Sequence, residues 1–153
     1  MAINMYLQIP NIKGGVATKG FAGALNVLAF SWGASNPTVA AQTPGSGAAK
    51  PSVQDLSITT FQDTATSPLI AALLNGAPLA KAVLSVVYGA STTGPAPVSD
   101  VYTMINVIVS SASLGGSGGE DQLTVNYSFN FAALDFRVSG KPVTWNITTN
   151  GPT

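Results

Sequence analysis

The chain has 153 residues, of which 46% are hydrophobic and only 8% are charged, with six basic and six acidic side chains. Globular proteins usually carry about 25% charged residues, so the shortage of charge is the most unusual bulk feature. The balanced charge gives no electrostatic reason to expect nucleic acid, an anionic membrane or an acidic substrate as a partner. We expect one domain over residues 1–153, with a surface that largely meets other protein subunits.

The residue types that most catalytic sites need are missing, since the chain has neither cysteine nor histidine. This excludes a Ser-His-Asp arrangement, a thiol nucleophile and an imidazole metal ligand. Glu120 and Asp121 are adjacent, so on an extended strand their carboxylates point to opposite faces and do not share one substrate. Asp55 and Asp135 form a second pair, whose proximity depends on the fold. We predict a protein that is not an enzyme and needs no cofactor or metal.

No targeting or membrane-spanning segment is visible in the sequence. Residues 1–6 lack a basic stretch followed by an apolar core, so they do not resemble a secretory signal. The longest apolar runs, residues 69–74 and 82–88, fall well short of the roughly 18 residues of a membrane-spanning helix. We expect the chain to start in the cytoplasm and not to insert into a membrane.

Two strands are predicted in the first part of the chain. From Ile3 to Ile9 apolar and polar residues alternate, with the period of a half-buried strand, and Pro10 ends the pattern. A second strand is predicted over residues 22–33, with Ser31 on the face opposite Trp32. The apolar residues expected to share one face of this strand are Leu28, Phe30 and Trp32.

The middle of the chain is predicted to contain a long loop and one short helix. Residues 34–51 are rich in Pro, Gly, Ala, Ser and Thr, which predicts an extended loop or a protruding hairpin. A strand is expected at residues 53–61, and then a helix at residues 67–75 that Ser67 caps and Gly76 ends. Further strands are predicted over residues 81–88, 98–110 and 143–148.

The longest amphipathic strand follows a glycine-rich turn. From Leu123 to Phe131 apolar residues occupy alternate positions, with uncharged polar residues between them. The phase changes at Ala132-Ala133, which predicts a β-bulge or a sharp twist. The turn motif consists of Gly115, Gly116, Gly118, Gly119, Glu120 and Asp121. Because acidic residues and a strand follow these glycines, the motif is not a phosphate-binding loop.

Roughly seven or eight strands with one helix predict a mainly β protein. We expect a two-sheet β-barrel or sandwich with one short flanking α-helix and a long extended loop. The amphipathic central strand needs partners on its apolar side, because one strand buries too little surface to offset the cost of ordering its backbone.

Two motifs are distinctive in combination: Leu-Ala-Phe-Ser-Trp-Gly at residues 28–33 and Gly-Gly-Ser-Gly-Gly-Glu-Asp at residues 115–121. Together they resemble the hemolysin-coregulated protein family, the tube protein of bacterial type VI secretion systems. The supporting matches lie at residues 5–7, 12–14, 53–57, 109–111 and 145–147. They keep the family's order across nearly the whole chain.

The resemblance implies a two-sheet β-barrel that assembles into hexameric rings, which stack into a tube. Rings of the family carry or chaperone secreted effector proteins in the lumen, sit beneath a spike protein and are enclosed by a contractile sheath. Such a protein stays in the bacterial cytoplasm before firing and is then secreted without a cleaved signal peptide. We expect no fused toxin domain after Thr153.

Within this framework the uncharged polar side chains are expected to line the lumen. The lumen-facing or cargo-facing candidates are Ser31, Thr124, Asn126, Ser128 and Asn130. The long loop is expected to contact the neighbouring ring. The ring-stacking candidates are Asn36, Pro37, Thr38, Gln42, Thr43 and Lys50.

The chain departs from the family pattern at residues 14–26, where relatives usually carry several charges and this chain has only Lys19. It also departs at residues 60–61, where it has Thr60-Phe61 and a charged residue is common in relatives. These positions are expected to tune ring stacking or partner choice.

Two alternative functions remain open. One is a carbohydrate-binding β-sandwich, in which exposed aromatic side chains stack on sugar rings. Its candidates are Tyr88, Tyr127 and Trp145. The other is a bacteriophage tail-tube protein, which would share the ring assembly.

Overall fold

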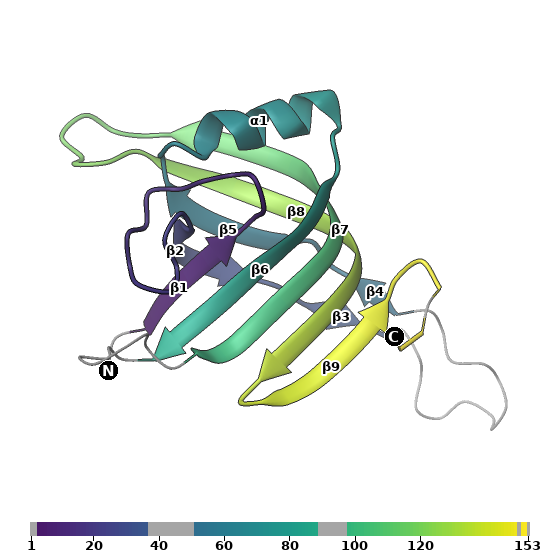
Figure 1. The fold of residues 1–153 in the computed structure, drawn as a ribbon. Helices are drawn as coiled ribbons and strands as arrows, with labels where there is room; N and C mark the ends of the chain where they lie inside the picture. Colours follow the sequence, from purple (N-terminus) through teal and green to yellow (C-terminus); the bar gives the residue numbers. More distant parts are fainter. Residues whose placement is uncertain (1–2, 37–50, 89–97, 150, 153) are drawn as a thin grey trace, which may run out of the picture.

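The computed structural model describes residues 3–36, 51–88, 98–149 and 151–152, which form nine strands and one helix (Figure 1). In chain order the elements are β1 (Ile3–Gln8), β2 (Leu25–Ser31), β3 (Ala34–Ser35), β4 (Ser52–Val53), β5 (Leu56–Phe61), α1 (Thr66–Asn75), β6 (Leu79–Tyr88), β7 (Val98–Gly115), β8 (Thr124–Val138) and β9 (Lys141–Asn146). Within the described ranges no helix has the length and apolar character needed to span a bilayer.

Six antiparallel strands close into a barrel in the order β5-β2-β1-β6-β7-β8, and β8 pairs back with β5. β9 extends the sheet beyond β8, β3 and β4 form a separate two-stranded sheet, and α1 packs beside β7. The predicted fold class, a mainly β barrel with one flanking helix, is confirmed (Figure 1). Most of the predicted long loop, residues 37–50, lies outside the described residues.

The core receives side chains from every barrel strand, because alternate residues of each strand point inward. The inward set includes Leu7, Leu25, Leu56, Leu84, Val107 and Phe129, which are all 0–1% exposed. Each such side chain contributes about 1.5–3 kcal/mol by leaving water. The apolar face predicted for the central strand is therefore the core face of β8.

The predicted phase change in the central strand is present, and a bend shared by two strands causes it. In β8 the buried positions pass from Phe131 to Leu134. Pairing with β7 keeps one register on both sides of this point, but Asn106 in the facing part of β7 has a positive φ of 53°. The two strands therefore bend together, while the irregularity in their pairing lies further along, between Val109 and Ser111.

The start of α1 differs from the prediction. Its N-cap position is Ala65, without a side-chain capping bond, and Ser67 lies inside the helix. The preceding turn is held differently, because the backbone N–H of Asp63 donates to the Thr66 hydroxyl at 3.0 Å. The C-terminal end agrees with the prediction, since Gly76 adopts the left-handed conformation with a φ of 66°.

β2 is shorter than the predicted strand over residues 22–33 and contains an irregularity. Its register with β5 shifts around Leu28, which is 41% exposed, whereas Phe30 and Trp32 pack against the core. The prediction that these three side chains share one face is wrong, because one extra residue at a bulge reverses the faces beyond it. Trp32 is therefore a packing residue, half-buried against the core.

A second, smaller cluster lies on the outward face of β1 and β6. Tyr6 stacks on Phe21 with ring centroids 4.5 Å apart, and Ala24 and Val87 complete the cluster. Residues 10–24 supply Phe21 and Ala24, so this segment covers the outside of that wall of the barrel.

Candidate functional site

Four strands present an outward face dominated by small uncharged side chains. They are β2, β5, β8 and the part of β7 beyond Val107, and we call this face the polar wall. Strand pairing places one serine from each strand side by side. This row consists of Ser31, Ser57, Ser128 and Ser111.

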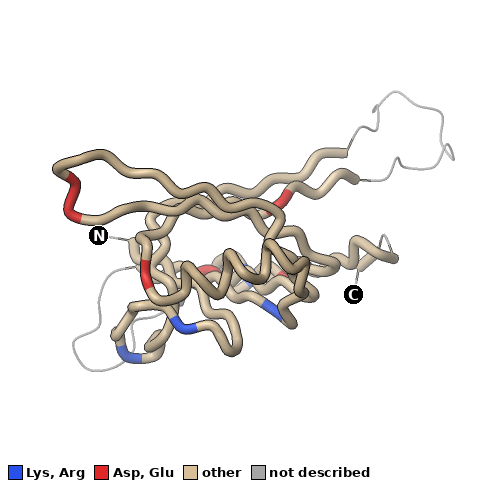
Figure 2. The backbone as a smooth tube through the Cα atoms, turned by 90° about the horizontal axis from the view of Figure 1, so that it is seen from above, with Lys and Arg blue, Asp and Glu red and all other residues tan. Residues whose placement is uncertain are grey.

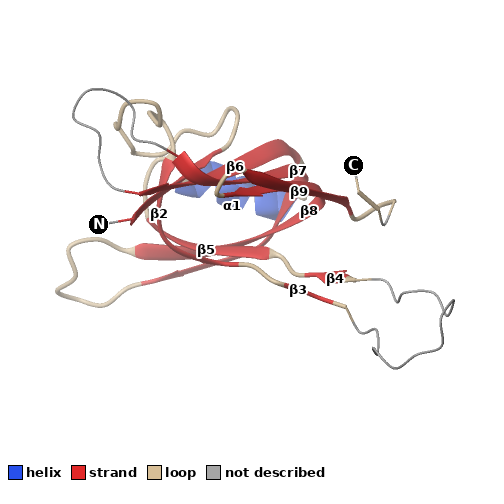
Figure 3. Ribbon diagram, turned by 90° about the horizontal axis from the view of Figure 1, so that it is seen from below, coloured by secondary structure: helices blue, strands red, loops and turns tan. Residues whose placement is uncertain are grey.

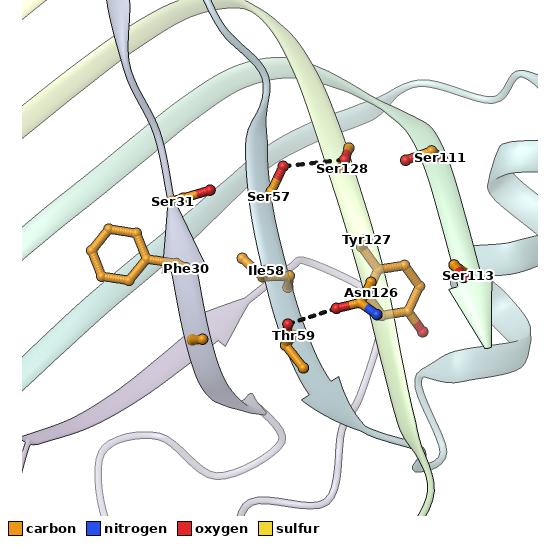
Figure 4. A pocket seen from close by; sticks show the side chains of 11 residues that line it. Phe30, Ser31, Ser57, Ile58, Thr59, Ser111, Ser113, Asn126, Tyr127 and Ser128 are labelled. Atoms are coloured by element: carbon orange, nitrogen blue, oxygen red, sulfur yellow. Dashed lines mark hydrogen bonds between the residues drawn. The ribbon is translucent and has the colours of Figure 1, made fainter. Parts of the chain in front are cut away.

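A second row runs parallel to the first, two residues along each strand. It consists of Ala29, Thr59, Asn126 and Ser113. The hydroxyl oxygens of Ser57 and Ser128 lie 3.3 Å apart, and Thr59 Oγ1 donates to Asn126 Oδ1 at 2.6 Å (Figure 4). These bonds tie β5 to β8, and the amide NH2 of Asn126 stays a donor.

The two rows surround a shallow hollow of about 270 Å³ in the middle of the polar wall (Figure 4). The hollow exists because serine and alanine are small, so that Phe30, Ile58 and Tyr127 from the core layer also line it. Tyr127 is only 1% exposed, and burial raises the pKa of its phenol, which therefore stays neutral. The hollow thus combines neutral hydrogen-bonding groups with an apolar floor.

One carboxylate borders the polar wall, and both of its oxygens have partners. The Ser110 hydroxyl donates to Asp55 at 2.7 Å, and Asn130 Nδ2 donates to it at 3.0 Å. Ser110 lies at the irregularity of β7, so the carboxylate fixes the point where β7 changes register. Asp135 instead lies 3.6 Å from Arg137, so the two carboxylates have different partners. Among the described residues no three His, Cys, Asp or Glu side chains gather as a metal site requires.

The structure brings three of the five lumen candidates together. Ser31, Asn126 and Ser128 line the hollow. Asn130 bonds the carboxylate at the border of the polar wall, and Thr124 lies at the far end of β8. Their exposure to a lumen stays a prediction.

Four polar residues in the two rows of the polar wall were not among the predicted site residues. The missed residues are Ser57, Thr59, Ser111 and Ser113. The alternation of Leu56, Ile58 and Thr60 along β5 is the signal that identifies the first two as outward. The irregularity at Ser110 hides the other two, because it changes which residues of β7 face outward.

The glycine motif forms the end of a long hairpin between β7 and β8. Gly115 is the last residue of β7 and pairs with Thr124, while Gly119 has a φ of 93°, a conformation that favours glycine. The carboxylate of Glu120 accepts a hydrogen bond from the backbone N–H of Ser117 at 3.4 Å. Figure 2 shows an acidic pair at this tip, far from the barrel.

Of the ring-stacking candidates, Asn36 is described and occupies an exposed position directly after β3. The other candidates, which lie outside the described residues, are Pro37, Thr38, Gln42, Thr43 and Lys50.

Comparison with known proteins identifies the family. A family model described as type VI secretion system effector, Hcp, matches residues 6–137. The chain belongs to the Hcp family. It is 37% identical over 162 residues to protein hcp1 of Pseudomonas aeruginosa, and the match covers 98% of each chain. The resemblance predicted from the two motifs is therefore confirmed.

Solved structures share the barrel of this Hcp protein. A type six secretion system protein superimposes with a TM-score of 0.87 at 24% identity, over 99% of this chain and 100% of its own. Hcp1 from Salmonella typhimurium superimposes with a TM-score of 0.80 at 23% identity, over 100% of both chains. Because both identities are below 25%, these similarities show a shared fold and nothing further.

Proposed function

We propose that this chain is a structural subunit of the type VI secretion tube, in which six copies form a ring and rings stack end to end. The observation that carries the proposal is the polar wall in a chain of the Hcp family. A charged or strongly apolar lining would hold a passing protein, whereas small neutral side chains hold it weakly. The polar wall therefore supports a role as the lining of the lumen.

Both lateral edges of the polar wall leave backbone groups for a neighbouring copy. β6 pairs with β7 only as far as Val107, so among the described strands residues 108–115 pair with β8 alone. On the other side β1 pairs with β2 at residues 25–27, so residues 28–31 pair with β5 alone. A free strand edge is a template for another strand. In a ring the two edges of adjacent copies meet in a heterologous contact that closes by rotation.

The proposed assembly assigns roles to the remaining partners. Effector proteins occupy the lumen and first meet the hollow around Ser31, Asn126 and Ser128, with Thr124 and Asn130 nearer its ends. A spike protein sits on the tube and a contractile sheath surrounds it. The chain acts in the bacterial cytoplasm before firing and leaves with the tube.

Cysteine labelling tests which face lines the lumen, because the chain has no native cysteine. Ser57→Cys lies in the polar wall, and Lys19→Cys lies on the exposed segment that covers β1 and β6. We expect light scattering to report six copies per particle, and a bulky maleimide to modify Lys19→Cys much faster than Ser57→Cys in rings. In denatured protein both cysteines should react alike. A strict monomer, or equal labelling in rings, would overturn the proposal.

The alternatives lose support for specific reasons. The carbohydrate-binding interpretation needs exposed aromatic side chains, but Tyr127 is 1% exposed and Trp145 packs partly buried against the core. Of the three candidates only Tyr88 is exposed, at 42%. The bacteriophage tail-tube interpretation shares the proposed ring assembly, but the family match is to type VI secretion.

A further inference from the structure

The β7–β8 hairpin carries an apolar pair at the base of its turn. Leu114 is 52% exposed and Leu123 is 48% exposed. Leu123 lies directly against Gly116, so the glycine leaves room for the end of this leucine side chain. Figures 1 and 3 show the hairpin projecting beyond the barrel. Two neighbouring exposed leucines on a projecting element form a small apolar surface that is available for contact with another protein.

An apolar groove of about 310 Å³ lies between the β3–β4 sheet and β9. Figure 3 shows the β3–β4 sheet at the opposite end of the barrel from the hairpin. Trp32 and Trp145, the two tryptophans of the chain, both line it together with Val53 and Leu134. Val143 also lines the groove and is 63% exposed. Both tryptophans are half-buried, so they pack against the core and leave only part of their surface to the groove. Tryptophan is enriched among the residues that dominate protein interfaces, so this remaining surface suits docking of a protein.

The charges beside the hairpin leucines and the groove are complementary. Glu120 and Asp121 at the hairpin tip are exposed and precede Leu123 by three and two residues. Lys141 begins β9 and precedes Val143 by two residues, so both lie on the same face of that strand. Acidic groups therefore neighbour the apolar pair, and a basic group neighbours the apolar groove. The two surfaces match in apolar character and in charge, which are independent properties.

We infer that the hairpin of one copy docks in the Trp32–Trp145 groove of a copy in the next ring. The inference rests on the proposed function, because it assigns the ring-to-ring contact of the tube. A projection at one end of a chain and a matching groove at the other make a heterologous contact, which repeats without closing and builds a filament. Pairing of the acidic tip with Lys141 gives the stack one polarity.

This contact differs from the stacking loop expected from the sequence. That loop spans residues 34–51, and its described ends, Asn36 and Pro51, also line the groove. The competing occupant of the groove is therefore the chain's own segment 37–50. The two occupants are distinguishable, because only docking of the hairpin involves Leu123 and Asp121.

Charged substitutions at the two surfaces test the inference. Leu123→Asp and Val143→Asp each place a carboxylate in an apolar contact, so we expect intact rings that no longer stack, observed by electron microscopy and sedimentation velocity. Leu74→Asp is the matched control, because Leu74 is 79% exposed on α1, and its rings should stack like the parent. Parent-like stacking of Leu123→Asp would overturn the inference, and an effect of Val143→Asp alone would assign the groove to residues 37–50.

Charge exchange provides a second, independent test. Lys141→Asp places like charges together and should reduce stacking, and adding Asp121→Lys should restore it. A double variant that stacks no better than Lys141→Asp would overturn the charge pairing, and loss of the rings themselves would place these residues between neighbours within a ring. Parent rings that never associate end to end would overturn the docking and leave the ring proposal standing. A monomeric parent would instead overturn the proposed function.

Discussion

The two walls of the barrel differ in what lies outside them. On the wall of β1 and β6, residues 10–24 cover the outward side chains, so Tyr6, Ser85 and Val87 are buried although they lie outside the barrel core. On the polar wall, outward serine, threonine and asparagine side chains remain exposed or half-buried. The inward faces of both walls contribute to the same core.

This difference shows where the chain completes its own structure and where it does not. Apolar groups outside β1 and β6 are unfavourable in water, and the chain covers them with its own segment. The polar wall needs no such cover, because small polar groups are well solvated. Stability therefore explains the composition of the covered wall, whereas the ring assembly that we propose accounts for the neutral rows and open edges of the polar wall.

The largest expected effect on stability comes from placing a charge on the inward, core-facing side of the polar wall. Phe129 is 0% exposed, so Phe129→Asp removes its packing and leaves an unpaired carboxylate in the core, at a cost above about 4 kcal/mol. We expect loss of the folded state, measured by circular dichroism and urea denaturation. Ser113→Asp is the matched control, because the same charge on the outward side stays solvated and changes stability by about 0.5 kcal/mol or less. A cooperatively folded Phe129→Asp would contradict the core assignment.

The inward face of β8 was predictable because alternation in one strand reflects burial directly. The same rule failed at Leu28, where one extra residue at a bulge reverses the faces and leaves no mark in the local pattern. The helix start was also mispredicted at Ser67. No side chain caps the helix, because the turn before it is held by hydrogen bonds from Asp63 N–H to the Thr66 hydroxyl and from Ala65 N–H to the Asp63 carboxylate.

The polar wall was predictable only in part, because its rows combine distant segments. Asn126 and Ser128 are visible as the polar face of a single strand. Ser57 meets Ser128 from 71 positions away in the chain, through the β5–β8 pairing that closes the barrel. Such a pairing register is a property of the whole barrel, so local patterns do not reveal which outward residues lie side by side.

Removing part of the cover outside β1 and β6 should have the second largest effect on stability. Phe21→Ala removes the ring that stacks on Tyr6 at 4.5 Å, and we expect destabilisation by about 3 kcal/mol with the barrel retained. Urea denaturation at a fixed protein concentration measures the change. Leu74→Ala is the control, since an exposed leucine on α1 contributes little. A cost below about 1 kcal/mol would show that the cover does not stabilise the wall.

A smaller effect on stability is expected at the border of the polar wall, where Asp55 accepts hydrogen bonds from Ser110 and Asn130. Asp55→Asn keeps the shape of the side chain but replaces one accepting oxygen by a donor, which faces Ser110 or Asn130. We expect a loss of about 1.5 kcal/mol, because hydrogen bonds to a charged acceptor are stronger than neutral ones. Ser110→Ala removes only one bond and should cost about 1 kcal/mol. The two changes should be non-additive in a double-mutant cycle, and additive costs would mean that the contact is not energetically coupled.

The smallest effect on stability is expected from Ser31→Gln, which adds a longer neutral amide at the edge of the hollow. Because Ser31 is exposed, stability should change by about 0.5 kcal/mol or less and the rings should remain intact. The longer side chain reaches over the hollow, so the amount of effector protein that co-purifies with the rings should change. Ser31→Ala is the control, because it leaves the hollow open and should retain cargo like the parent. Failure of Ser31→Gln to assemble would place this residue in the contact between subunits and show that its assignment to the lumen is wrong.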